Sequence, residues 1–167
     1  MQPERKYKRR EARDIPGHLH LLTFSTRKRV PHLRHEQICV WLAEAITKAK
    51  NTHLFHVLAY VFMPDHVHLL IRPLAESYRV ADILKSIKQG VSRRAVNAGL
   101  IDDVLWELGG GHDRNIFTEE VRANAISYIH MNPVRKGLCS DMIDYRWSSA
   151  RAVLFGEQGE IEVDGSW

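Results

Sequence analysis

The chain has 167 residues, of which 44% are hydrophobic, and its 24 Lys and Arg against 20 Asp and Glu give a formal net charge of +4. This length and composition predict one domain with a core of its own, and they argue against a disordered chain or a mini-protein held by disulfides or metal. Cys39 and Cys139 form no CxxC motif, and no apolar run approaches the roughly 18 residues of a membrane helix. Because the N-terminus also lacks the apolar segment of a secretory signal, we expect a cytoplasmic protein with no membrane association.

The chain begins with a strongly basic stretch. Its cations are Arg5, Lys6, Lys8, Arg9, Arg10 and Arg13. Such a stretch cannot pack by itself, so it is either a solvated tail or an arm that contacts phosphates. We expect residues 1–14 to form a flexible basic arm, residues 15–150 to form the folded domain and residues 151–167 to form a C-terminal tail.

Hydrophobic patterning predicts the first half of the domain. The apolar run at 18–25 indicates a buried strand that leads into a basic turn containing Arg27 and Lys28, and residues 35–50 have the spacing of an amphipathic helix. Two more strands are expected at 54–59 and 67–71, with Pro64 marking a strand entry or bulge between them.

The second half begins with an amphipathic helix at 79–97. Its basic residues outside the apolar stripe are Lys85, Lys88, Arg93 and Arg94. The glycines at 109–111 lack the ending of a phosphate-binding loop and are interpreted as a connector. A further strand is expected before a third helix, which runs from 119 to about 132 and ends because of Pro133. With a short strand at 160–163 as a last candidate, this order predicts an α+β sandwich with helices on one face of the sheet.

Two histidines provide the strongest local signal. His66 and His68 alternate along a predicted strand, so both imidazoles project from one face and could bind a divalent metal. The alternative is a pair of structural histidines at a sheet edge. His18 and His20 would also share a face, but no neighbouring Asp or Glu distinguishes that pair.

A polar row lies on the third predicted helix. Asn124, Tyr128 and Asn132 are spaced four residues apart and therefore project along one side of the helix, beside an apolar stripe. Spacing alone favours a tyrosine at the margin of the core. The amides next to it raise the alternative that Tyr128 faces a site, where a phenol could act as a nucleophile if its proton were removed and the electrophile were polarised by a metal.

Three segments together resemble a known family. The sequences MPDHVHLL, YIHMNPVRKGL and DYRWSSA are similar to those of the single-tyrosine HUH transposases of the IS200/IS605 type, and most similar to the REP-associated tyrosine transposase branch. The resemblance extends from about residue 18 to residue 150. It implies an α+β fold, with a ferredoxin- or RRM-like antiparallel sheet covered by helices and the histidines on a central strand.

The resemblance also implies an activity. His66 and His68 match the family's metal ligands, Tyr128 matches its nucleophile, and Asn132 matches a third, amide ligand. Members of the family use Mg²⁺ or Mn²⁺ to cleave single-stranded DNA beside hairpins. They form a 5′-phosphotyrosine and a free 3′-hydroxyl, which allows strand transfer, and they act as monomers or homodimers.

Beyond these four positions, DNA contacts are expected from basic residues. The candidates are Arg5, Lys6, Arg9, Arg10, Arg27, Lys28, Lys85, Lys88, Arg93 and Arg94. The chain departs from the family pattern at Asp65, where many relatives have Asn, and at residues 107–116, which replace an aromatic-rich segment.

Two other functions are open on the sequence. The first is a domesticated nucleic-acid-binding protein that has the same fold but no catalytic activity, against which the intact histidine, tyrosine and asparagine set argues. The second is a zinc hydrolase, which would need a strong third ligand such as that of an HExxH motif, and this motif is absent from the sequence.

Overall fold

The computed structural model describes residues 13–165. Its elements are β1 (Leu19–Ser25), η1 (Arg27–Arg29), η2 (His32–Arg34), α1 (Glu36–His53), β2 (Phe55–Met63), β3 (His66–Pro73), α2 (Val80–Asn97), β4 (His112–Ile116), α3 (Glu119–Arg135), η3 (Met142–Asp144) and α4 (Ala150–Phe155). The basic cluster expected at the N-terminus lies, except for Arg13, outside the described residues. None of the helices in residues 13–165 has the length and apolar character needed to cross a membrane.

The four strands form one antiparallel sheet in the order β2-β3-β1-β4. This is the strand order of a ferredoxin-like fold, and it confirms the predicted fold class. β3 is a central strand, as the resemblance implied for the two histidines. In the pairing of β1 with β3, Thr23 lies opposite His68 and Ser25 lies opposite His66.

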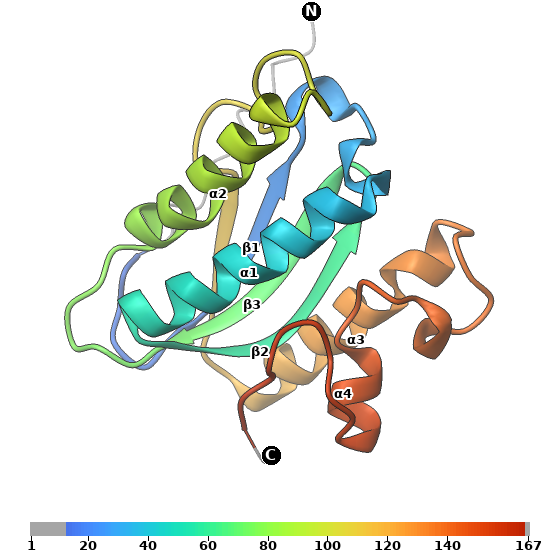
Figure 1. Ribbon diagram of the computed structural model, residues 1–167. Coiled ribbons are helices and arrows are strands. Elements are labelled where there is room, and N and C mark those ends of the chain that lie inside the picture. The colour runs from blue at the N-terminus through green and yellow to red at the C-terminus, as the bar shows by residue number, and fades with distance from the viewer. Residues whose placement is uncertain (1–12, 166–167) are drawn as a thin grey trace, which may run out of the picture.

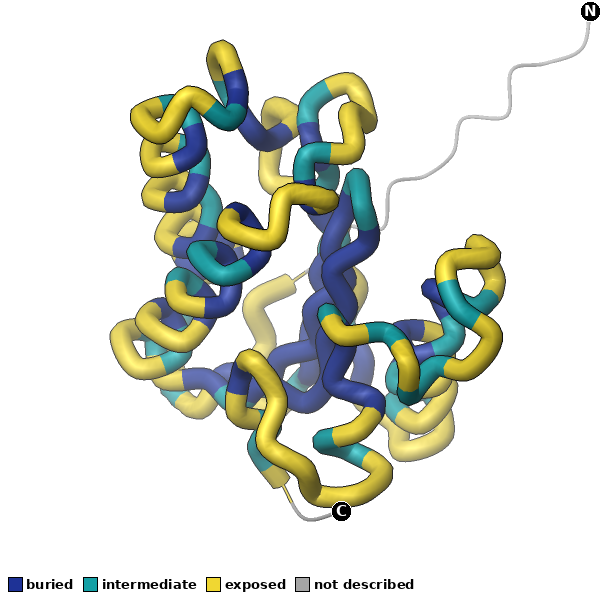
Figure 2. The backbone as a smooth tube through the Cα atoms, turned by 45° about the vertical axis from the view of Figure 1, so that its right-hand side comes forward, coloured by how far each residue is buried: buried dark blue, intermediate teal, exposed yellow. Residues whose placement is uncertain are grey.

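Helices cover both faces of the sheet. α1 and α2 pack on one face, where Phe24, Val67 and Leu69 belong to the larger core cluster (Figure 1). α3 packs on the other face through Ala125 and Ile129, against a smaller cluster on β1, β2 and β3. The expectation that all helices lie on one face is therefore wrong. Figure 2 shows that the strands are buried between the helices, whose outer surfaces are exposed.

Two boundaries also differ from the prediction. Pro133 lies inside α3, which continues to Arg135. A proline this close to the end of a helix removes a single backbone hydrogen bond and can be tolerated. Residues 160–163 are irregular and form no strand. Ile161 is buried there, and its backbone amide donates to the Tyr60 hydroxyl and not to a neighbouring strand.

The glycine connector has a structural role at its last position. Gly111 has φ of +79°, and a Cβ there would lie 2.3 Å from the carbonyl oxygen of Thr23. Only glycine combines this conformation with such a close approach. Gly111 therefore lets the chain come close to β1 as β4 begins.

Candidate active site

His66 and His68 project from β3 onto the face of the sheet that α3 covers. Both are buried, and their ring centroids are 4.8 Å apart. His68 Nδ1 forms a 2.8 Å hydrogen bond with the Thr23 hydroxyl, whereas its Nε2 is buried and has no hydrogen-bond partner among the described residues. A buried nitrogen without a partner costs free energy unless something binds it. The chemistry of this pair fits a divalent metal.

Asp65 orients the second imidazole. Its Oδ1 accepts a hydrogen bond of 2.7 Å from His66 Nδ1, and its Oδ2 is 3.6 Å from the guanidinium of Arg29. A carboxylate on one ring nitrogen leaves Nε2 as the nitrogen with the lone pair, which is the usual arrangement behind a metal-binding histidine. The negative charge that Asp65 has, and that an Asn at this position would lack, therefore faces His66 Nδ1 and the guanidinium of Arg29.

Tyr128 reaches the histidines from α3. Its ring lies edge-on to that of His68 at a centroid distance of 5.2 Å, and its side chain is 41% exposed, so solvent reaches it. The guanidinium of Arg135 lies 5.6 Å from the Tyr128 ring centroid. A half-exposed tyrosine beside two buried imidazoles is placed for chemistry more than for core packing.

Asn132 and Asn124 lie one turn away from Tyr128 on either side. Asn132 is 5% exposed. Asn124 is exposed and lines a cavity together with His68 and Tyr128. No group of three His, Cys, Asp or Glu side chains suited to a metal is present in residues 13–165. A metal at the histidine pair would therefore need amide or substrate oxygens to complete its ligands.

The segment 145–149 fixes α3 to the sheet. Tyr145 donates a hydrogen bond to the carbonyl oxygen of Phe62, and the amide of Phe62 donates to the carbonyl of Trp147, so this segment runs along the free edge of β2. His130 of α3 forms a 2.9 Å hydrogen bond with the Ser149 hydroxyl. The segment 145–149 therefore helps to hold α3, the helix that carries Tyr128, against the sheet.

His18 and His20 lie away from this site. His20 is completely buried on the opposite face of the sheet, with Nδ1 2.9 Å from an Asp113 oxygen and Nε2 2.8 Å from the Tyr78 hydroxyl. His18 stacks on Phe117. The carboxylate that accompanies His20 is that of Asp113, which comes from β4 and not from the neighbouring sequence.

The expected DNA-binding residues are dispersed. Lys85, Lys88, Arg93 and Arg94 lie on α2, which covers the sheet face opposite the histidine pair. Lys88 donates to the carbonyl of Gly109, and Arg94 pairs with Glu44 at 2.6 Å. Arg27 pairs with Asp103, while Lys28 is exposed in η1. Arg5, Lys6, Arg9 and Arg10 lie outside the described residues.

Other polar residues beside the site were missed by sequence reasoning. His112 and Arg114 of β4 line the cavity that contains His68 and Tyr128, while Arg34 and Lys136 line a second cavity that contains His66. The HDRNI sequence of β4 has no apolar alternation, so nothing in it indicated that a strand would bring these side chains to the site.

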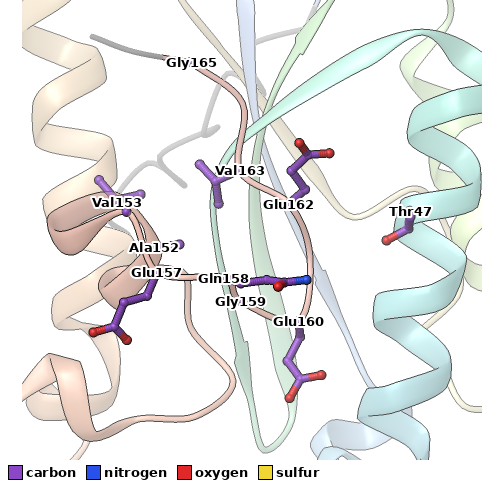
Figure 3. Close-up of a pocket in the computed structure, with 11 residues that line it drawn as sticks. Thr47, Ala152, Val153, Glu157, Gln158, Gly159, Glu160, Glu162, Val163 and Gly165 are labelled. Carbon is purple, nitrogen blue, oxygen red and sulfur yellow. The ribbon is translucent and has the colours of Figure 1, made fainter.

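A larger cavity lies elsewhere in the chain. It has a volume of about 710 Å³ and is formed between the C-terminal segment and α1 (Figure 3). Its charged lining residues are Glu157, Glu160 and Glu162, without any Lys or Arg. These carboxylates pair with Arg151, Arg146 and Lys50, so the lining offers no cation to a polyanion, and the smaller cavities beside the histidine pair are better suited to nucleic acid.

Two buried histidines predict a pH-dependent stability. Burial lowers the pKa of His68 from 6.5 to about 4, with smaller contributions from His66 and Arg29, and burial alone lowers the pKa of His130 to about 4. The unfolded chain then binds more protons than the folded chain between these values. The free energy of unfolding should therefore be highest above pH 6.5 and fall as the pH approaches 4, by on the order of 3 kcal/mol per histidine.

Denaturant unfolding with a chelator present tests this expectation. His130→Gln keeps a partner for Ser149 but cannot titrate. In the unchanged chain, both histidines lower the free energy of unfolding as the pH falls. In the variant only His68 does so, and the histidine-dependent decrease should be about half as large. Because carboxylates titrate equally in both proteins, the difference between the two curves isolates His130. Parallel curves would show that His130 protonates equally easily in both states.

The fold and the sequence together place the chain in a class of protein. Its four-stranded antiparallel sheet with helices on both faces is an α+β fold. A family model described as "Transposase IS200 like" matches residues 16–107, and the chain belongs to this family. The match includes both histidines and ends before α3. No curated protein matches the sequence.

Solved structures similar to the chain include the following two. One is a REP-associated tyrosine transposase bound to a REP hairpin, with a TM-score of 0.70, 22% sequence identity and coverage of 93% of this chain and 92% of the other. The other is a transposase-like protein from Deinococcus radiodurans, with a TM-score of 0.49, 21% identity and coverage of 71% of this chain and 94% of the other. The first likeness supports the predicted fold.

Proposed function

We propose that this transposase-family protein is a metal-dependent enzyme that cleaves and rejoins single-stranded DNA next to hairpins, with Tyr128 as its nucleophile. The observation that carries the proposal is the buried Nε2 of His68, which has no hydrogen-bond partner within residues 13–165. The His68 ring lies next to that of His66, and its centroid is 5.2 Å from that of the Tyr128 ring. The two histidines as metal ligands and Tyr128 as nucleophile would then lie close enough for one phosphate to contact both the metal and the tyrosine. The REP hairpin bound by the similar structure supports a hairpin substrate.

The reaction exchanges one phosphate ester for another. The Tyr128 phenolic oxygen forms a bond to the phosphorus, and the bond to the 3′ oxygen breaks. The phenol loses its proton and the departing 3′ oxygen gains one, which leaves a 5′-phosphotyrosine and a free 3′-hydroxyl. His66, His68 and Asn132 would hold Mg²⁺ or Mn²⁺, which when bound polarises the phosphate for attack.

A covalent adduct assay tests the activity. The protein is incubated with Mn²⁺ and labelled single-stranded DNA that contains a hairpin flanked by random sequence. A labelled band that survives denaturation and disappears on protease treatment is expected. DNA binding without any such band, over a range of hairpin libraries, would favour the second candidate function, an inactive nucleic-acid-binding protein of the same fold.

Asn132 should affect the metal and leave the fold intact. Two imidazoles and an amide bring no negative charge, so we expect loose binding that tightens when a DNA phosphate adds an oxygen ligand. Mn²⁺, which accepts imidazole more readily than Mg²⁺, should support cleavage at a lower concentration. Asn132→Ala should weaken Mn²⁺ binding in calorimetry, and Asn132→Asp should tighten it but slow the attack, because the added charge reduces the pull of the metal on the phosphate.

Asn124→Ala is the matched control, since it removes the same amide one turn beyond Tyr128. It should leave Mn²⁺ binding unchanged. If the unchanged chain binds Mn²⁺ tightly without DNA, and Asn132→Ala binds it with the same affinity, Asn132 is not a ligand of the metal.

The basic arm should contribute to DNA binding through phosphates. Deleting residues 1–12 removes five cations and leaves Arg13, whose backbone pairs with the Asn115 side chain on β4. If two or three of these cations contact phosphates, the slope of log affinity against log salt concentration should become shallower by roughly 1.4–2.1 for single strands. A slope unaffected by the deletion would assign the arm to solvent.

A further inference from the structure

Two cavities adjoin the histidine pair, one lined by His68 and Tyr128 and the other by His66. The first, which we call the α3–β4 cavity, has a volume of about 430 Å³ and includes His68, Tyr128, His112, Arg114 and Asn124 in its lining. The second, which we call the turn cavity, has a volume of about 320 Å³ and is lined in part by His66, Arg29, Arg34 and Lys136. Because His66 and His68 are neighbours on one strand face, a chain that crosses them would enter one cavity and leave through the other.

The α3–β4 cavity has the properties of a site for a nucleobase. Leu21, Val121 and Ala125 give it apolar walls, and the polar ends of Arg114 and Asn124 are available at its surface. Neither side chain has a hydrogen bond or ion pair to another residue within 13–165. Arginine binds the O6 and N7 atoms of guanine with two hydrogen bonds, and asparagine pairs similarly with adenine. In a single strand these edges are exposed.

The turn cavity has a different chemistry. Its lining has three cations and one carboxylate, Asp65, which is already engaged by His66 and Arg29. Arg34 and Lys136 are exposed and have no ion pair within the described part of the chain. Cations without partners on a concave surface bind backbone phosphates without regard to sequence.

We propose, on the basis of the function proposed above, that the DNA strand crosses the site from one cavity to the other. The base of one nucleotide beside the cleaved phosphate lies in the α3–β4 cavity, where Arg114 and Asn124 select a purine, and above all a guanine. The nucleotides on the other side lie in the turn cavity, where Arg34 and Lys136 hold their phosphates. Arg114 is thus a specificity-determining residue, while Arg34 contributes affinity.

Equilibrium binding to a random single-stranded library tests the path without requiring cleavage. With a chelator present no strand is cut, so the result does not depend on the nucleophile or the metal, and the covalent adduct assay reports separately on the proposed function. Three proteins are compared: the unchanged chain, Arg114→Gln and Arg34→Gln. The two variants lose the same charge from exposed positions, and circular dichroism checks that each has folded.

The unchanged chain should prefer a purine at one position by roughly tenfold, within the range expected for a bidentate contact. Arg114→Gln should lose this preference and keep the salt slope. Arg34→Gln should keep the preference, bind all sequences more weakly and flatten the slope by roughly 0.7. The proposal is overturned if the unchanged chain shows no base preference, if Arg114→Gln retains it, or if Arg34→Gln loses it.

Discussion

Tyr128→Phe is expected to abolish the covalent adduct and retain DNA binding. Phenylalanine keeps the ring beside His68 but lacks the oxygen that would attack the phosphorus, so cleavage should fall by at least about a thousandfold. The free energy of unfolding should change by less than about 1 kcal/mol, because the side chain is already 41% exposed. Gel analysis of the adduct and fluorescence anisotropy with the same DNA measure the two effects.

Tyr145→Phe is the matched control for this variant. Its hydroxyl donates to the carbonyl oxygen of Phe62, and within residues 13–165 Tyr145 makes no hydrogen bond or ring contact with the histidine pair. It should destabilise the fold by roughly 1 kcal/mol and still form the adduct. An adduct of normal yield in Tyr128→Phe would mean that another residue is the nucleophile.

His66→Ala and His68→Ala should each reduce metal-dependent cleavage to background. Each change removes one of two imidazoles, and the remaining ligands bind a divalent metal too weakly to retain it at low metal concentration. Single-strand binding without metal should be nearly unchanged. Cleavage measured over a range of Mn²⁺ concentrations distinguishes a weakened metal site, which added Mn²⁺ would partly restore, from a loss of folding.

The other histidine pair provides the controls. His18→Ala should cleave normally. His20→Ala should cleave as well, but it should be less stable by roughly 2 kcal/mol, because it leaves the Asp113 and Tyr78 side chains without their shared partner. Activity that depends on His18 or His20 and not on His66 and His68 would contradict this assignment.

The central elements could be predicted because their side-chain periods are clear. The strand beginning near residue 18 and the helices near 36 and 80 carry strong apolar patterns, and each was found within a few residues of its predicted bounds. β4 was predicted without bounds, because an edge strand with the sequence HDRNI has no apolar alternation. The side of the sheet that α3 covers depends on packing between distant segments, which periodicity alone does not specify.

In the site, too, local spacing could be predicted from the sequence and tertiary contacts could not. Alternation on a strand places His66 and His68 on one face, and helical spacing places Asn124 and Tyr128 in one row. The contact between these two groups is tertiary, and only the packing of α3 on β2 and β3 brings Tyr128 to His68. Arg114 and Lys136 could not be foreseen, since isolated cations in the sequence do not show which cavity they line.

Mapping the covalent adduct by mass spectrometry is the most direct test of Tyr128 as the nucleophile. The protein would be incubated with Mn²⁺ and hairpin-containing single-stranded DNA, then digested with nuclease and protease. We expect a nucleotide linked through its 5′-phosphate to the peptide that contains Tyr128, together with a released strand that ends in a 3′-hydroxyl. A nucleotide attached to any other residue, or cleavage with no attached nucleotide, would contradict the assignment of Tyr128 as the nucleophile.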